Sequence, residues 1–315
     1  MKESITVSLT GGLGNQLFQL ANGLKVAQGR PVRLEYKIGK PRLTQLGLPD
    51  VSSFSLPTNV QLLNLKEPSW VLRKACGFTL RSSIFPRWIE DIRIFRKIVQ
   101  MVTSVLVSQY LKSWHWVQSG RNLGFSELGK IKNKTFLIGY FQTFQNALDR
   151  STRKNLHSLV PTIGKDEIDN YRLLAEIEQP VVIHLRLTDY NLENAFGIPS
   201  PNYYKDALRL LGKNIQIGKV WIFSDDQEKA REILPQSITQ DARWIPEVCQ
   251  SAACTLEVMR LGSHYIIGNS TFSWWGAFLS YADNATVIAP APWFQGMAEP
   301  RDLIPPNWLR VDAWK

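Results

Sequence analysis

Near each end of the chain, an apolar stretch runs directly into a glycine-containing turn and then into a segment with helical periodicity. Residues 5–9 are strand-like, residues 10–15 read Thr-Gly-Gly-Leu-Gly-Asn, and residues 16–28 place apolar side chains on one helical stripe. The same order recurs from residue 265 to about residue 281. Strand, tight turn and helix in this order are typical of an α/β protein with parallel sheets.

The remaining pattern predicts further elements and a division of the chain. Strands are predicted at 31–36, 180–187, 219–224 and, as the last one, 286–289, and helices at 201–211 and 227–234. Residues 40–135 indicate mostly irregular and helical structure. A chain of 315 residues is long enough for two domains, and proline, glycine and charged residues near 158–167 predict a linker between domains 1–160 and 161–315.

The charge of the chain is unevenly distributed. The net charge is +10, but residues 1–160 carry 23 Lys and Arg against 8 Asp and Glu, whereas residues 161–315 carry 14 against 19. The basic half suits an anionic partner, such as a membrane surface, a nucleic acid or a phosphorylated substrate. Basic and aromatic residues alternate over 66–112, as at a lipid headgroup interface, although a solvated helix face gives the same pattern. Because no DNA- or RNA-binding motif is legible here, we expect no nucleic-acid partner.

The cysteines and the apolar segments favour a cytoplasmic protein. The three cysteines, at positions 76, 249 and 254, are widely spread and indicate neither a disulfide framework nor a zinc site. No secretory signal pattern is present, and the longest apolar stretch in a basic setting, residues 98–106, is far shorter than a spanning helix. We therefore expect at most a peripheral contact with the inner face of the plasma membrane.

The first glycine turn differs from the known nucleotide-binding fingerprints. A dinucleotide signature needs a third glycine where the chain has Leu17, and no Gly-Lys-Ser/Thr follows the glycines. Glu35 still ends the second predicted strand, where a ribose-binding acid would lie, so a dehydrogenase stays open. We expect the amides of Asn15 and Gln16 to contact ligand hydroxyls, the alternative being that Asn15 caps the helix.

A second group of polar residues lies at the end of the strand predicted at 180–187. Because side chains alternate along a strand, His184 and Arg186 project from one face and their apolar neighbours from the other. Ligands of open α/β sheets bind beyond the carboxyl ends of the strands. The planar Arg186 guanidinium matches a phosphate, and Asp189 is placed to act as a general base or to orient Arg186. A structural ion pair for Arg186 and a turn role for Asp189 are the alternatives.

Two more turns follow predicted strands. Asn269, Ser270 and Thr271 precede a helix, so their amides and hydroxyls form a candidate anion site at its N-terminus. Asp225 and Asp226 follow the strand at 219–224. For this pair we rank recognition of a base or ribose first, a helix cap second and a divalent metal third.

In this order, the four groups resemble the motifs of the α-1,2-fucosyltransferases of glycosyltransferase family 11. The matching segments read GGLGNQ from residue 11, HLR-x-x-DY from 184, FSDD from 223 and GNSTFSWW from 268. The resemblance implies a GT-B arrangement, with two Rossmann-like domains facing across a cleft, the acceptor on the first domain and the GDP-sugar on the second. The implied reaction is inverting transfer of L-fucose from GDP-β-L-fucose to an oligosaccharide hydroxyl, O2 of a galactose-type residue. It implies no essential metal or other cofactor, and the acceptor is expected on a lipid carrier.

The resemblance also implies which residues hold the leaving group. His184 and Arg186 would contact the donor, with Arg186 at the β-phosphate. Asp189 would take the acceptor proton, with Glu193 as the alternative. The turn that would hold the diphosphate consists of Asn269, Ser270, Thr271 and Phe272.

The remaining assignments concern the nucleoside and the facing domain. Asp225 or Asp226 would bind the nucleoside, and Asn15, with Gln16 beside it, would reach the donor from the first domain. One position departs from the family, since Leu187 replaces the second of two consecutive arginines common there. Because position 187 lies on the opposite strand face from Arg186, the phosphate site need not lose its cation.

Three other classes of function remain open. A nucleic-acid binder would explain the basic first half, and a steep salt dependence of binding would be its signature. A nucleotide-sugar or NAD-dependent oxidoreductase would share the strand and turn order but lacks the third glycine at Leu17. A non-catalytic carbohydrate-binding protein could use the eleven tryptophans as stacking platforms. Such a protein would have no need of a phosphate-directed arginine.

Overall fold

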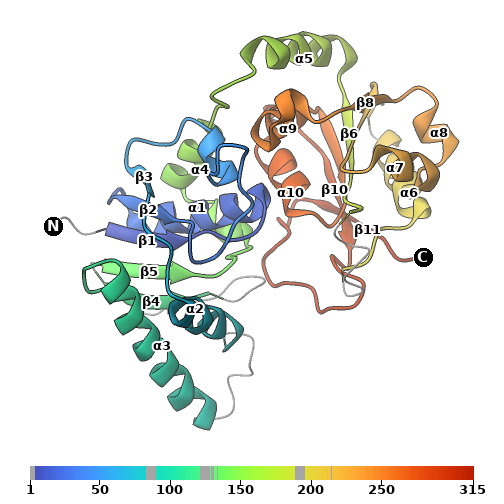
Figure 1. Ribbon diagram of the computed structural model, residues 1–315. Helices are drawn as coiled ribbons and strands as arrows, with labels where there is room; N and C mark the ends of the chain where they lie inside the picture. Colours follow the sequence, from blue (N-terminus) through green and yellow to red (C-terminus); the bar gives the residue numbers. More distant parts are fainter. Residues whose placement is uncertain are drawn as a thin grey trace. The chain divides into compact units, whose positions relative to one another are not determined.

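The computed structural model divides into two compact units (Figure 1). It describes residues 4–82, 90–120, 128, 131–132, 134–188, 196–213 and 215–315, without the side chains of 81–82 and 90–96. The first unit comprises Met1–Leu159 with Pro300–Leu303, and the second comprises Val160–Glu299 with Ile304–Lys315. The observed boundary falls at residue 159, and the short segment 300–303 returns to the first unit because Asp302 O accepts hydrogen bonds from Phe144 N and Thr143 Oγ1.

The first unit is built on a parallel sheet in the order β3-β2-β1-β5-β4. Its strands are β1 (Ser4–Ser8), β2 (Val32–Glu35), β3 (Val60–Leu63), β4 (Trp116–Ser119) and β5 (Lys134–Ile138). Its helices are α1 (Leu13–Ala27), η1 (Asp50–Ser53), α2 (Trp70–Ser82), α3 (Glu90–Tyr110), η2 (Phe144–Asn146) and α4 (Arg150–His157). The strands β3, β4 and β5 lie in or next to the stretch for which the sequence predicts mainly irregular and helical structure.

Helix α1 begins at the glycine turn, three residues earlier than the sequence predicts. Gly12 is the N-cap residue and makes no side-chain hydrogen bond, so Asn15 lies inside the first turn and does not cap the helix. Gly11 has a positive φ of 71°, and a Cβ there would lie 2.4 Å from Asn15 Nδ2. Glycine is thus required at position 11 both by its backbone conformation and by the closeness of Asn15.

The second unit has a six-stranded parallel sheet in the order β11-β10-β9-β6-β7-β8. Its strands are β6 (Val181–Leu185), β7 (Val220–Ser224), β8 (Arg243–Ile245), β9 (His264–Ile267), β10 (Val287–Ala291) and β11 (Leu309–Asp312). Its helices are α5 (Lys165–Glu178), α6 (Pro201–Gly212), α7 (Gln227–Ile233), α8 (Gln236–Thr239), η3 (Val248–Gln250), α9 (Ala252–Met259) and α10 (Thr271–Phe278). The expected α/β class with parallel sheets is confirmed, but β10 is not the last strand, because β11 pairs with it at the sheet edge.

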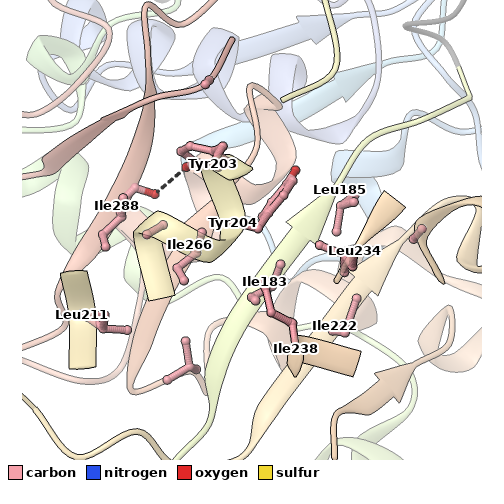
Figure 2. Close-up of a cluster of buried hydrophobic side chains, with 14 of the residues drawn as sticks. Ile183, Leu185, Tyr203, Tyr204, Leu211, Ile222, Leu234, Ile238, Ile266 and Ile288 are labelled. Carbon is pink, nitrogen blue, oxygen red and sulfur yellow. Dashed lines mark hydrogen bonds between the residues drawn. The ribbon is translucent and has the colours of Figure 1, made fainter. Parts of the chain in front are cut away.

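One face of this second sheet carries the main apolar core of the unit (Figure 2). Ile183, Leu185 and Leu187 all lie in this cluster and are fully buried. Helix α6 is fastened to the same face by Tyr203, whose hydroxyl donates to Ile267 O at 2.6 Å. The alternation predicted from the sequence is confirmed, and His184 and Arg186 therefore leave the opposite face of the strand.

Among the helices that the structure describes, none combines the length and the apolar composition needed to cross a bilayer.

Candidate functional site

The polar segments of the second unit meet at the carboxyl ends of three adjacent strands. Strand β6 lies between β9 and β7, and His184 is in register with Ile267 on one side and with Phe223 on the other. The residues that directly follow these strands, at 186–188, 225–226 and 268–272, therefore leave the same edge of the sheet. In open parallel sheets this edge is where ligands bind.

Asp225 organises the backbone that follows β6. Its Oδ1 accepts the Leu187 N–H at 2.8 Å, and its Oδ2 accepts the Thr188 N–H at 3.2 Å and the Thr188 hydroxyl. The same Oδ2 lies 3.3 Å from Arg186 Nη1. Burial opposes ionisation of this carboxyl, but the Thr188 hydroxyl and the Arg186 charge together hold its pKa below the ordinary value. Both oxygens of Asp225 thus hold the chain's own loop, and its contact with the nucleoside stays a prediction.

Arg186 is positioned by this carboxylate and still reaches solvent. Its side chain is 26% exposed, compared with 18% for Asp225. A guanidinium that is fixed on one side by a carboxylate loses little further freedom when it binds an anion on its open side. Thr188 completes this arrangement, because its backbone N–H and its hydroxyl both bond Asp225. It is not among the site residues predicted from the sequence, where only its position two residues after Arg186 could have indicated it.

His184 is a buried imidazole beside the same loop. It is 4% exposed, and no described group hydrogen-bonds its Nδ1. Burial, assisted by the Arg186 charge, lowers the pKa of His184 to about 3. Its ring centroid lies 5.9 Å from that of Phe272 at the start of α10. Buried polar atoms almost always have a partner, so this nitrogen is unusual among the described residues.

The turn before α10 combines helix capping with loop anchoring. Ser270 is the N-cap residue, and its Oγ accepts the Phe272 N–H at 3.3 Å. Asn269, 2% exposed, donates from Nδ2 to Phe196 O at 2.8 Å and to Gly197 O at 3.0 Å. The Asn269 amide nitrogen therefore anchors a neighbouring loop, and its contact with a diphosphate stays a prediction. Thr271, the first residue of α10, and Phe272 stay partly exposed at the sheet edge.

Asp226 caps a helix, which the sequence ranks second for this position. Its Oδ1 accepts the Lys229 N–H at 3.0 Å at the start of α7. The carboxylate therefore satisfies a backbone donor that would otherwise have no intrahelical partner. This bond agrees with the second-ranked interpretation, and contact with a base or ribose stays a prediction.

We expect Asp226→Ala to lower the free energy of unfolding by about 0.5–2 kcal/mol, because α7 loses its N-cap. Affinity for GDP, the nucleotide that the resemblance implies, should not change. Urea unfolding and calorimetric titration on the same preparations measure both quantities. Asp226→Asn is the matched control, since asparagine caps a helix equally well. A loss of GDP affinity in both variants would show that Asp226 binds the nucleoside.

In the first unit, the buried Gln16 amide forms hydrogen bonds with backbone groups of the chain. It is 0% exposed, its Nε2 donates to Gly11 O at 3.0 Å and Arg42 O at 3.1 Å, and its Oε1 accepts the Val51 N–H at 2.9 Å. The predicted ligand contact is therefore wrong for Gln16. Asn15 differs, because it is partly exposed and its Oδ1 accepts from Gln142 Nε2 at 2.8 Å. Its contact with a ligand stays a prediction.

Glu35 does not have the environment of a ribose-binding acid. It is 0% exposed, and its Oε1 accepts the backbone N–H groups of Lys37 and Ile38 at 2.6 and 3.0 Å, while Oε2 accepts the Ser8 hydroxyl. Burial raises the pKa of Glu35 to about 7 in spite of these bonds. A fully enclosed carboxyl leaves the dehydrogenase alternative without its ribose contact.

The candidate bases Asp189 and Glu193 lie outside the described residues. Within the parts of the chain that are described, no three His, Cys, Asp or Glu side chains gather as metal ligands would.

Structural comparison aligns the chain with two solved transferases at low identity. Fucosyltransferase NodZ from Bradyrhizobium is 15% identical, with 89% of this chain and 94% of that chain covered and a TM-score of 0.46. The ADP-heptose lipopolysaccharide heptosyltransferase II of E. coli is 9% identical, with 98% and 90% covered and a TM-score of 0.48.

Sequence comparison gives both a family and curated relatives. An α-1,2-colitosyltransferase of Escherichia coli is 27% identical over 319 residues, covering 98% of this chain and 99% of its own length. The O-antigen biosynthesis glycosyltransferase WbnK of Escherichia coli is 28% identical over 197 residues, covering 59% and 61%. The model of glycosyl transferase family 11 matches residues 92–312, which include three of the four motif segments. The chain thus belongs to glycosyltransferase family 11, as the ordered motifs predict.

Proposed function

We propose that this glycosyltransferase transfers L-fucose from GDP-β-L-fucose to a hydroxyl of an oligosaccharide and forms an α1,2 linkage with inversion at the anomeric carbon. The observation that carries the proposal is the Arg186 guanidinium, held by Asp225 at 3.3 Å on the strand face that also carries His184, whose Nδ1 has no hydrogen-bond partner among the described residues. A fixed cation next to a buried, neutral hydrogen-bonding group suits a diphosphate joined to a sugar.

The leaving group is the part of the reaction that these residues serve. As the bond from the anomeric carbon to the β-phosphate oxygen breaks, negative charge grows on the diphosphate. Arg186 faces this charge from one side, and the amino end of α10, at Thr271, adds its dipole. In this proposal a protein cation supplies the charge that a divalent metal supplies in other transferases, so transfer should proceed with a chelator present.

Attack comes from the acceptor hydroxyl on the opposite side of the sugar ring, through a transition state with oxocarbenium character. Its proton goes to a carboxylate, for which the sequence offers Asp189 first and Glu193 second. His184 remains neutral at the pH of the reaction because its pKa is about 3, so it contributes a hydrogen bond rather than a charge.

The names of two relatives bear on the identity of the donor sugar and of the acceptor. One relative is named an α-1,2-colitosyltransferase and another an O-antigen biosynthesis glycosyltransferase. The first name supports the α1,2 linkage and makes GDP-colitose the competing donor, which differs from GDP-fucose by the hydroxyl at C3. The second name supports an acceptor that belongs to a bacterial surface polysaccharide.

The test is a transfer assay with GDP-fucose and GDP-colitose, each offered with galactose-terminated oligosaccharides in the presence of a chelator. Mass spectrometry identifies the added sugar, and NMR of the product gives the linkage and the anomeric configuration. An α1,2-linked fucose supports the proposal as stated, whereas an α1,2-linked colitose corrects the donor alone. A retained β configuration, or transfer that requires a metal ion, would overturn the mechanism.

A further inference from the structure

The inner side of helix α3 in the first unit carries two buried hydroxyl residues beside Val107, which packs in an apolar cluster. Thr103 and Ser104 are 0% and 1% exposed, although each carries a hydroxyl. The Thr103 hydroxyl is 2.8 Å from that of Thr79 on α2, and Ser104 Oγ accepts the Val117 N–H of β4 at 3.1 Å. These bonds fix the side of α3 that faces the rest of the unit (Figure 1).

The opposite side of the same helix is apolar and faces solvent. Ile98, Met101, Val102 and Val105 are 50%, 57%, 49% and 39% exposed, and we call these four residues the α3 stripe. Their spacing of three, four and seven positions places them on one side of the helix. The outer side of a surface helix ordinarily carries charged and polar residues. An apolar stripe on the outer side therefore indicates a surface that another apolar medium covers.

Aromatic side chains follow the stripe along the chain. Trp114 and Trp116, just after α3, are 49% and 36% exposed, and their ring centroids are 5.5 Å apart. Lys132 Nζ lies 3.2 Å from the centroid of the Trp116 ring. Tryptophans next to basic groups suit the headgroup layer of a bilayer, where one end of the indole is apolar and the other is wet.

The charge around the α3 stripe favours an anionic lipid surface over a second copy of the chain. Between Asp91 and Glu127 the chain has five Lys and Arg and no acidic residue. Lys97 comes directly before the stripe and Lys112 follows the end of α3, and both are exposed. A second copy of the chain would bring a like-charged surface against this one, which is unfavourable, whereas anionic headgroups would neutralise it.

We propose that the α3 stripe, with Trp114, Lys97 and Lys112, seats the first unit on an anionic lipid surface. The helix lies along the surface because its inner side stays bonded to α2 and β4. Its apolar side chains enter the boundary between headgroups and acyl chains, and the lysines remain at the level of the phosphates. This binding is separate from donor chemistry and would bring the enzyme to acceptors carried on lipid.

The test is flotation of the full chain with vesicles of phosphatidylcholine alone and of phosphatidylcholine mixed with phosphatidylglycerol. The wild-type chain should float only with the mixed vesicles, and added salt should release it. The triple variant Ile98→Gln, Met101→Gln and Val105→Gln keeps good helix formers and should weaken binding at least about tenfold. Lys97→Gln with Lys112→Gln should weaken binding by about fivefold for each lysine.

The control replaces two apolar residues that are even more exposed, Leu173 and Ile177 on α5, by glutamine. They are 61% and 80% exposed, and their replacement should leave vesicle binding unchanged. Transfer to a soluble acceptor should be the same in all these variants. The proposal is wrong if the wild-type chain does not bind anionic vesicles, or if the triple variant binds them with the same affinity as the wild-type chain. Sedimentation that shows a wild-type dimer, abolished in the triple variant, would assign the stripe to a second copy instead.

Discussion

Replacing Arg186 by alanine is expected to lower kcat/KM for sugar transfer by about 10²- to 10³-fold, because the charge on the departing diphosphate loses its fixed cation. GDP affinity should fall by roughly 2–3 kcal/mol, as expected for the loss of a charge-assisted phosphate contact. Folding should suffer little, because Asp225 keeps its hydrogen bonds from Leu187 and Thr188. Steady-state kinetics and calorimetric titration measure the two losses.

Two further variants separate the role of the planar Arg186 guanidinium from a general effect of removing positive charge. Arg186→Lys keeps the charge but not the planar geometry, so it should recover only part of the activity. Arg209→Ala removes an exposed arginine that pairs with Asp206 on α6 and should behave as wild type. If Arg186→Ala binds GDP as tightly as Arg209→Ala does, Arg186 forms only a structural ion pair with Asp225.

The second large effect concerns Leu187, where many family members have an arginine. Leu187→Arg should lower the free energy of unfolding by at least about 3 kcal/mol, because it places a permanent charge in the apolar cluster that holds Ile183 and Leu185. The measurement is urea unfolding followed by circular dichroism. Failure to accumulate as soluble protein would agree with the same cause.

Leu187→Met is the matched control for this site. It conserves volume and apolar character and should cost less than about 1.5 kcal/mol. If Leu187→Arg instead folded with wild-type stability and bound GDP more tightly, the side chain at position 187 would reach the phosphate site. That result would contradict the strand face assigned to this residue.

The central strands of the second sheet could be predicted from the sequence because each is an apolar run that enters a distinctive turn. β6, β7 and β9 lie within two residues of the expected positions, and the alternation at 183–187 predicts correctly which side chains face the core. Five strands were not predicted, and four of them, β3, β4, β8 and β11, are the edges of the two sheets, whereas the fifth, β5, lies between β1 and β4. Edge strands are short and half exposed, so they leave little apolar pattern to find.

The candidate site could be located from the sequence, but several roles within it could not. Strand ends and turns indicate where polar side chains gather. They do not tell whether a carboxylate or an amide binds a ligand or the chain's own backbone. Asp226 bonds a backbone N–H of its own helix start, as short polar side chains readily do. Asp225, Asn269 and Gln16 instead bond backbone groups at least 35 residues away along the chain, which a local sequence pattern does not indicate. Arg186 pairs with Asp225, and its side chain remains 26% exposed.

The central claim is that the carboxyl edge around β6 binds the diphosphate of a guanine nucleotide. Calorimetric titration of the wild-type chain with GDP, UDP and NAD, in the presence of a chelator, tests it most directly. The account predicts that GDP binds without metal and more tightly than UDP, and that NAD does not bind. Absence of GDP binding, or equal affinity for GDP and UDP, would contradict the assignment of this edge to the GDP-sugar.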